Sequence, residues 1–223
     1  MECYEPGDQT AQNKLDQLKA EYDFEFVRED LPKLLKSMQT GTDRIREIVL
    51  SLRNFSRLDE AELKQADLHA GIESTLMILQ HRLSCNAEKL PISVQKHYGE
   101  IPAVTCYAGL LNQVFMNLIS NAIDAIALNH GDRPPQITIT TSITETAVRV
   151  SIGDNGIGIS AADQTSIFNP FFTTKSVGQG TGLGLSISYK IITEQHQGQI
   201  WVESVLGQGS TFWIEIPRSA QNG

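Results

Sequence analysis

The chain has 223 residues, of which 40% are hydrophobic and 20% charged, so it can form an ordinary globular core. Its net charge of −8 gives no general attraction to nucleic acid or to anionic membranes, and we expect neither as a partner. The three cysteines are odd in number and lack CxxC spacing, which favours reduced thiols in a cytoplasmic protein over a zinc site or disulfide framework. No apolar run approaches the about 18 residues of a membrane span, and the first residues do not resemble a signal peptide.

The first regular element that the sequence predicts is a long helix from Asp30 to about Leu58. Asp30 can cap this helix, and Pro32 is tolerated in its first turn. Residues that recur at alternating steps of four and three define a heptad seam: Leu31, Leu35, Met38, Thr42, Ile45, Val49 and Leu52. Three further apolar residues widen the seam: Leu34, Ile48 and Phe55. A stripe of this width favours a helical bundle. The helix either packs on its own domain or forms a homodimer through residues 31–58, and we expect the dimer.

Beyond residue 67, helical and alternating patterns interleave. Helices are expected at 70–83, 107–128 and 183–194, and strands at 92–98, 136–143, 147–152, 199–205 and 210–217. Most of the strands come as hairpins. We therefore expect a two-layer α/β (α+β) sandwich with a mixed, mostly antiparallel sheet, preceded by the bundle helix. The boundary is placed between a helical region at 1–66 and a second domain at 67–223.

Two carboxamides stand out on the helix expected at 107–128. Asn117 and Asn121 are four residues apart, so they share one face. Because the rest of this helix is largely apolar, the two amides need partners or a cavity. An amide oxygen is a hard ligand that suits Mg²⁺. Local hydrogen bonding within the helix is the alternative, and this pair alone leaves it open.

Asp154 ends a strand pattern and is followed by Gly156 and Gly158. Glycines let the backbone approach a flat ring closely. A carboxylate beside that ring can accept a hydrogen bond from the exocyclic amine of adenine, whereas guanine has an oxygen there, which favours ATP over GTP. The alternative is a common Asp-Asn-Gly turn in a hairpin.

Four glycines at every second position, residues 178–184, precede the last expected helix. They place several backbone N–H groups beside a helix N-terminus, which can form a phosphate cradle. The spacing fits neither a P-loop nor a dinucleotide motif. Thr181 and Lys175 are possible extra phosphate contacts. We expect a lid here rather than only a flexible loop. Three phenylalanines are expected to anchor its base, or to contact the helical region: Phe168, Phe171 and Phe172.

Together, residues 117–124, 154–158, 168–175 and 178–185 resemble the N, G1, F and G2 boxes of bacterial sensor histidine kinases. This fold is shared with gyrase, heat-shock chaperone and mismatch-repair ATPases. The resemblance implies an ATP-binding catalytic domain that uses Mg²⁺, with Asn121 as the metal ligand and Asp154 as the adenine contact. The other ATP-binding positions that it implies are Asn117, Gly156, Gly158, Lys175, Gly180, Thr181, Gly182, Leu183, Gly184 and Thr211. At Asp124 many of these kinases have a basic residue, so one phosphate contact is expected to be missing.

Asn117 takes the place of a glutamate that serves gyrase-type ATPases as general base. A neutral amide cannot accept the proton of a water, and such a base contributes roughly 10²–10⁴-fold to the rate. We therefore do not expect efficient hydrolysis of ATP. We expect instead that the phosphoryl group is transferred to another acceptor. In histidine kinases the acceptor is a histidine in the first helix of a dimerisation hairpin.

None of the five histidines has the context of a phosphoacceptor, and all are expected to be ordinary surface residues: His69, His81, His97, His130 and His196. The helix at 31–58 resembles the second helix of the hairpin, so the acceptor helix would precede residue 1. We expect this chain to bind Mg-ATP without labelling itself. The parent kinase, which could be membrane-attached, would serve a response-regulator receiver domain. The alternative is a nucleotide-binding regulatory module or an anti-sigma-type Ser/Thr kinase of the same fold, although these lack a long bundle helix.

Overall fold

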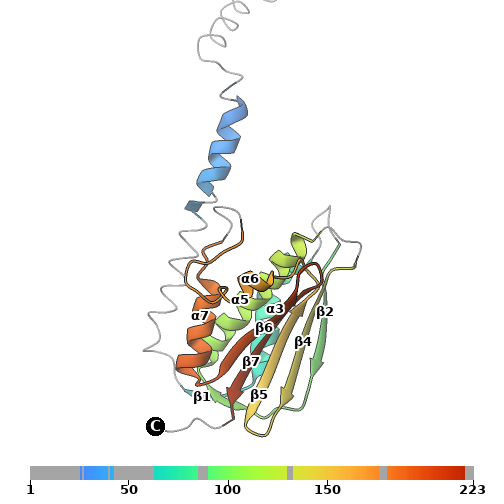
Figure 1. Cartoon of the computed structure of the whole chain (residues 1–223), viewed down its shortest axis with the longest axis vertical. Helices are drawn as coiled ribbons and strands as arrows, with labels where there is room; N and C mark the ends of the chain where they lie inside the picture. Colours follow the sequence, from blue (N-terminus) through green and yellow to red (C-terminus); the bar gives the residue numbers. More distant parts are fainter. Residues whose placement is uncertain are drawn as a thin grey trace, which may run out of the picture.

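The structure is a computed structural model, shown in Figure 1. It describes residue 26 and residues 28–39, 41–42, 63–84, 90–129, 133–175 and 180–218. Among these residues no helix combines the length and the apolar character needed to cross a membrane.

A five-stranded sheet forms one layer of the domain. Its strands are β2 (Ser93–Tyr98), β4 (Gln136–Ile143), β5 (Ala147–Asp154), β6 (Gln199–Val205) and β7 (Gly209–Pro217). The order across the sheet is β2-β4-β5-β7-β6. Only the β2–β4 pair is parallel, and the other pairs are antiparallel. The expected mixed, mostly antiparallel sheet is confirmed, including both predicted hairpins.

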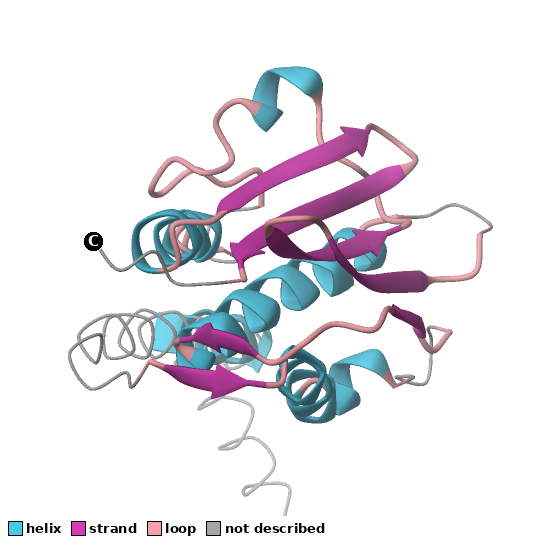
Figure 2. Ribbon diagram, turned by 90° about the horizontal axis from the view of Figure 1, so that it is seen from below, coloured by secondary structure: helices cyan, strands magenta, loops and turns pink. Residues whose placement is uncertain are grey.

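Helices cover one face of this sheet and form the second layer (Figures 1 and 2). They are α3 (Leu68–Ile78), α4 (Gln80–Leu83), α5 (Ala108–Ala127) and α7 (Gly184–Lys190), which continues into a π-helical turn, η2 (Ile191–Gln195). The prediction at 107–128 was almost correct for α5. The helix expected at 183–194 ends earlier as an α-helix because the chain widens into η2.

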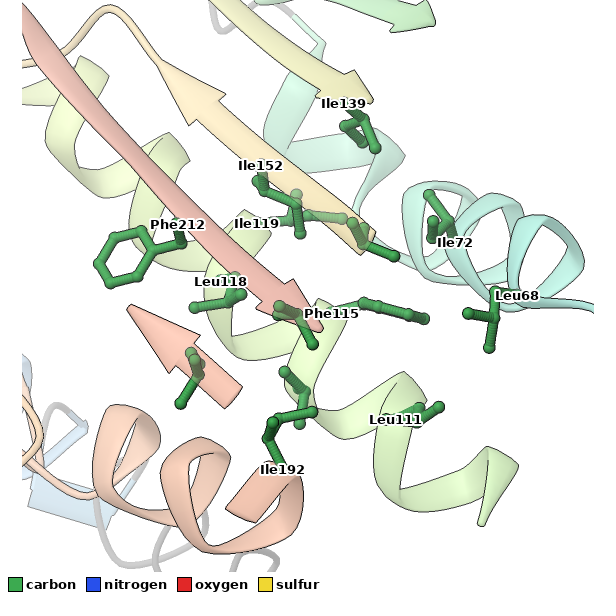
Figure 3. Packing of buried hydrophobic residues seen from close by; sticks show 14 of the residues in the cluster. Leu68, Ile72, Leu111, Phe115, Leu118, Ile119, Ile139, Ile152, Ile192 and Phe212 are labelled. Carbon is green, nitrogen blue, oxygen red and sulfur yellow. The ribbon is translucent and has the colours of Figure 1, made fainter. Parts of the chain in front are cut away.

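The core lies between α5 and the sheet. Nine residues of α5 are buried at the spacing of a helix face, and Phe115 and Ile119 are fully buried. Ile139 of β4 and Ile152 of β5 meet them from the sheet, and Ile192 of η2 closes one side (Figure 3). Burial of each such side chain stabilises the fold by roughly 1.5–3 kcal/mol, so α5 is the central element of the domain.

Two short strands and one short helix were not predicted. β1 (Lys64–Ala66) pairs antiparallel with β3 (Val104–Cys106), and β1 precedes the boundary expected at residue 67. α6 (Ala161–Gln164) begins after Ser160, whose Oγ accepts a hydrogen bond from the N–H of Asp163. Elements of three or four residues are too short to show a hydrophobic period.

The sheet face away from the helices carries an aromatic pair. The rings of Trp201 and Trp213 are stacked, with centroids 5.9 Å apart and planes inclined by 8°. The Arg149 guanidinium lies 5.7 Å and 5.8 Å from the two ring centroids and bonds to the Glu215 carboxylate. Cation–π contacts of this kind and cross-strand pairing stabilise the outer face of β5, β7 and β6.

The long N-terminal helix is only partly described. Residues 28–39 and 41–42 are helical, and residues 43–62 lie outside the described residues together with the rest of the seam. In the described part, the side chains of Leu31, Leu35 and Met38 are 50%, 56% and 62% exposed. Thr42 Oγ1 donates to the carbonyl of Met38 at 2.9 Å, which satisfies the polar atom within the helix. The full length of the helix stays a prediction.

Candidate functional site

A cavity of about 900 Å³ runs along α5. One wall comes from α3 and α4, and the other comes from the segments that follow β5 and precede α7. Nine of the predicted nucleotide-binding residues line it: Asn117, Asn121, Asp154, Gly158, Lys175, Gly180, Thr181, Gly182 and Gly184. The fold therefore brings four separate sequence motifs to one concave site, and a cavity of this size suits a cofactor-sized ligand.

Three predicted positions do not line this cavity: Gly156, Leu183 and Thr211. Thr211 lies on the outer face of β7, and its Oγ1 is 3.1 Å from the position of a Cβ added to Gly153. Its neighbours Ser210 and Phe212 line the cavity instead. Alternation along β7 explains the difference, because successive side chains of a strand point to opposite faces. Sequence reasoning missed Ser210, although the same alternation could have indicated it.

Asp154 lies at the end of β5, opposite Ser210 of β7. Its Oδ1 accepts a hydrogen bond from the Gly156 N–H at 2.8 Å. Burial raises the pKa of Asp154 to about 6, and hydrogen bonds from the backbone of Gly156 and Ser210 oppose this shift. The group is therefore ionised at neutral pH and can accept a further hydrogen bond from a ligand.

Close packing of the backbone explains both glycines after Asp154. The sequence had suggested a different reason, the approach of the backbone to a flat ring. A Cβ on Gly156 would lie 2.5 Å from the backbone carbon of Ala125 in α5. Gly158 has φ +71°, and a Cβ there would lie 2.2 Å from the carbonyl oxygen of Val205 in β6. Only glycine lets this turn pack so closely against both elements. The turn then fixes the position of Asp154.

Asn117 and Asn121 of α5 point to different partners. Asn117 Nδ2 donates to the Gly184 carbonyl at 3.1 Å and to Ser188 Oγ at 3.2 Å, which ties α5 to α7. Asn121 Oδ1 accepts from Lys175 Nζ at 3.4 Å. Asn117 therefore has a structural role whether or not it contacts a ligand, whereas the amide oxygen of Asn121 faces a cationic group in the cavity.

Lys175 is part of a charged cluster that the sequence did not reveal. Its Nζ lies 2.5 Å from Asp124 Oδ2, and Arg82 of α4 lies 2.6 Å from Asp124 Oδ1. All three side chains line the cavity. Arg82 was missed because no local pattern links a residue of α4 to a position some forty residues later, and only the packing of α3 and α4 beside α5 joins them.

The glycine-rich segment is described from residue 180, and residues 176–179, which include Gly178, lie outside the described residues. Gly182 has φ +66°, and a Cβ there would lie 2.4 Å from the backbone carbon of Phe171. The Phe171 N–H donates to the Gly182 carbonyl at 2.9 Å. This close backbone contact fixes the start of α7 against the segment that carries Lys175.

The phenylalanines divide into two kinds. Phe168 and Phe172 are partly buried and pack against the core, which confirms the expected anchoring. Phe171 is 74% exposed and has φ +66°, so its side chain does not anchor the segment. Whether Phe171 contacts the helical region stays a prediction.

The expectation of surface histidines was wrong for His196, which is 8% exposed. Its Nδ1 lies 2.8 Å from the Ile191 carbonyl, and its Nε2 accepts from the Tyr107 N–H at 3.1 Å. Burial lowers the pKa of this imidazole. His69 is half-buried and stacks on Tyr98, His81 and His97 are exposed, and His130 lies outside the described residues.

Comparison with known proteins identifies the family. Residues 107–220 match the model of the histidine kinase-, DNA gyrase B- and HSP90-like ATPases. The chain belongs to this family. The match covers every motif discussed above, from the start of α5 to the end of β7.

Several relatives that the chain resembles are histidine kinases. The chain is 35% identical over 180 residues to the signal transduction histidine-protein kinase AtoS of Escherichia coli, covering 80% of this chain and 28% of AtoS. A solved catalytic domain of histidine kinase ThkA is 35% identical with a TM-score of 0.60, covering 70% of this chain and 96% of that domain. Histidine kinase ThkA solved in complex with the response regulator protein TrrA is 27% identical with a TM-score of 0.63, covering 82% of this chain and 50% of that one.

These similarities confirm the predicted family, and the chain carries a histidine kinase catalytic domain of the ATP-binding type. It spans 28% of AtoS and 37% of the sensor histidine kinase ZraS of Escherichia coli K12, so it corresponds to roughly a third of these two relatives.

Proposed function

We propose that this chain transfers the γ-phosphoryl group of ATP to a histidine that lies outside it, as the catalytic part of a two-component sensor histidine kinase. The observation that carries the proposal is the single cavity in which Asp154, Asn121 and Lys175 meet the glycine-rich segment. A carboxylate for adenine, an amide oxygen for a metal and cations for phosphates are the groups that Mg-ATP requires.

The residues present fit a magnesium ion. Mg²⁺ prefers oxygen ligands and takes few of them from the protein, because it keeps waters and the phosphate oxygens of its substrate. Asn121 Oδ1 would be the protein ligand. In the structure this oxygen accepts from Lys175 Nζ at 3.4 Å, so one cationic group already lies where a cation would be bound. The metal would neutralise charge on the phosphates.

In the transfer, the bond between the γ-phosphorus and the bridging oxygen breaks, and a bond to an imidazole nitrogen of the acceptor forms. ADP leaves with the bonding electron pair, and the imidazole proton passes to solvent. The chain's own contribution is positioning and charge stabilisation, which carry most of the catalysis in phosphoryl transfer. Asp154 would orient adenine, and Lys175, Gly180 and Thr181 would contact the phosphates.

Asn117 favours this reaction over hydrolysis. Its amide donates to Gly184 and Ser188 of α7. Replacing Asn117 with Glu would introduce a base, but it would also place a carboxylate against the Gly184 carbonyl and weaken the contact with α7. We expect Asn117→Glu to lower thermal stability and, because it supplies a general base, to raise ATP hydrolysis above the wild-type level. Efficient hydrolysis by the wild type would favour an ATPase of the gyrase class instead.

Calorimetric titration with Mg-ATP tests the binding half of the proposal, and Asp154→Ala provides the control. Binding by the wild type and its loss in Asp154→Ala would support the assignment of adenine to this carboxylate. If neither protein binds Mg-ATP, the proposed function fails.

Radioactive labelling tests the second half. With Mg-[γ-³²P]ATP we expect no acid-labile phosphate on any of the chain's five histidines. A labelled histidine in this chain would overturn the proposal that the acceptor lies outside it. Phosphoserine or phosphothreonine on a bound partner would favour the anti-sigma-type alternative.

The proposal extends to partners and compartment. We infer a homodimer through the helix at 31–58, a response-regulator receiver domain as partner of the parent kinase, and a cytoplasmic location for this part of it. The exposed apolar residues of the described helix support the dimer. They also disfavour the regulatory module, which would not need a long bundle helix. The complex of ThkA with a response regulator protein supports the receiver domain.

A further inference from the structure

The cavity contains a charged cluster of one anion between two cations. Arg82 and Lys175 contact different oxygens of Asp124, at 2.6 Å and 2.5 Å. Among the described residues that line the cavity, these two are the only cations, and Asp154 is the only other carboxylate. Asp154 accepts from the backbone of Gly156 and Ser210 and makes no ion pair with either cation. The cluster is therefore the one concentration of positive charge in the described walls.

The cluster is accessible to a ligand. The side chains of Arg82, Lys175 and Asp124 are 33%, 26% and 34% exposed, and all face the cavity. Exposure of this extent lets a phosphate reach the donors. Partial burial excludes much of the water that would otherwise screen their charges, so ionic contacts here are stronger than on an open surface.

The donors suit phosphate oxygens. A guanidinium has five N–H donors in a fixed fork that matches phosphate geometry, and an ammonium has three. A carboxylate and a phosphate are both anionic acceptors, so they compete for the same N–H groups. The chain's net charge of −8 provides no general attraction for a triphosphate, which makes these two local cations more important.

We propose that Arg82 and Lys175 bind the phosphates of the nucleotide, and that Asp124 acts as an internal competitor that occupies both cations and weakens nucleotide binding. This inference rests on the proposed function and extends it. Arg82 adds a phosphate-binding residue from α4. Asp124 is a positioning residue that acts through the two cations, and it sets the affinity so that the nucleotide can be exchanged.

Binding measurements on three single variants test the proposal. Mg-ATP binding is measured by calorimetry, and adenosine, which has no phosphate, by ligand-observed NMR. We expect Asp124→Asn to bind Mg-ATP about three- to tenfold more tightly, and Arg82→Ala and Lys175→Ala to bind it about tenfold more weakly. Adenosine binding should be unchanged in all three. Glu145→Gln is the matched control, because it removes one negative charge from an exposed turn at the other end of β5.

Two further variants, a double and a triple, separate competition from simple repulsion. In Arg82→Ala/Lys175→Ala, adding Asp124→Asn should tighten Mg-ATP binding less than it does in the wild type, because the cations are gone. If Asp124→Asn tightens Mg-ATP binding by the same factor in both backgrounds, Asp124 does not act through the two cations, and its proposed role is overturned. Unchanged Mg-ATP binding in Arg82→Ala would overturn the assignment of Arg82.

The outcomes also distinguish the two proposals. If the wild type binds Mg-ATP in an Asp154-dependent way but a folded Asp124→Asn binds no more tightly, only the competition is overturned. If neither the wild type nor Asp124→Asn binds Mg-ATP, the proposed function and this inference both fail. Thermal unfolding of each variant shows which of them are folded.

Discussion

At the scale of single residues, Asp154 combines a cost to folding with the role in adenine binding that we propose for it. Its pKa is about 6 in the folded state, against 3.8 for the free side chain, because burial disfavours the charge. A raised carboxylate pKa means that folding favours the protonated form. The stability that this group contributes is therefore greatest below about pH 4 and is lost as the pH rises through about 6.

We expect Asp154→Asn to raise the unfolding free energy at neutral pH by on the order of 1–3 kcal/mol, because it removes a partly buried charge while keeping an acceptor oxygen. It should also weaken Mg-ATP binding. Thermal unfolding and calorimetry on the same samples check both effects.

The affinity of the wild type for Mg-ATP should fall about tenfold per pH unit below about pH 6, and the Asp154→Asn variant should lack this dependence. Equal pH profiles would contradict the role of the carboxylate.

His196 gives the opposite pH dependence. Burial lowers the pKa of its imidazole, and the neutral ring joins the Ile191 carbonyl to the Tyr107 N–H. Protonation would remove the acceptor at Nε2. This group therefore contributes stability above the ordinary histidine pKa of about 6.5, and the contribution is lost as the pH falls toward the lowered value.

We expect His196→Ala to destabilise the fold by about 2–3 kcal/mol at neutral pH, since it removes a buried ring and the acceptor of the Tyr107 N–H. His196→Gln, which can donate and accept, should recover part of the loss. Urea denaturation at about pH 7.5 and about pH 5.5 measures this, and Asp154→Asn is a suitable background because it removes the opposing titration. If His196→Ala is as stable as the wild type, the contacts of the His196 ring with Ile191 and Tyr107 do not contribute to the stability of the fold.

Single residues also show where sequence reasoning ends. The spacing of Asn117 and Asn121 and the position of Asp154 indicated one pocket, because local motifs report on sites built from local segments. Arg82 and His196 were missed or misjudged. Their roles depend on which elements pack together, and no spacing along the chain encodes that.

At the scale of elements, three glycines of the same segment have different surroundings. A Cβ on Gly182 would lie 2.4 Å from the Phe171 backbone in a positive-φ conformation, and one on Gly180 would meet Thr173 Oγ1 at 2.9 Å. At Gly184 the nearest atom would be 3.5 Å away, in the side chain of Asn117. Alternate glycines that look equivalent in the sequence are therefore not equivalent in the fold.

We expect Gly182→Ala to destabilise the protein by about 1–3 kcal/mol and to weaken Mg-ATP binding, because backbone atoms cannot move aside cheaply. Gly184→Ala should be tolerated within about 0.5 kcal/mol. Thermal unfolding and calorimetry of the pair check this. Equal effects of the two substitutions would show that the segment acts only as a flexible linker.

The elements themselves were largely predictable. α5 and the four longest strands have clear periods, since each buries one face against the other layer. β1, β3 and α6 were not predicted because three or four residues carry no period. η2 replaced the end of a predicted helix, and nothing in its sequence separates a π-helical turn from an α-helical one.

At the scale of the whole molecule, the apolar stripe of residues 31–38 leads to a prediction about assembly. Leu31, Leu35 and Met38 are at least half exposed in the described helix. Together with the seam that continues beyond it, they are expected to be buried in a homodimer.

We expect Leu31→Glu/Leu35→Glu to shift the chain toward a monomer, because charges in the seam cannot be buried without partners. Sedimentation velocity over a range of concentrations measures this, and Glu29→Gln, an exposed change just before the seam, is the control. Mg-ATP affinity should be unchanged, since neither leucine lines the cavity. A wild-type chain that is monomeric at all concentrations would contradict the dimer.

The stacked pair of Trp201 and Trp213 has a spectroscopic consequence. These are the two tryptophans of the whole chain, and both lie on the sheet face away from the cavity. Their emission therefore reports on the integrity of β6 and β7, and a nucleotide among Asp154, Asn121 and Lys175 has no indole beside it to quench. Two indoles stacked at 5.9 Å should also couple their transitions and give a paired circular dichroism band that disappears when the sheet unfolds. The protein thus has a built-in optical probe of folding that is nearly silent to its ligand.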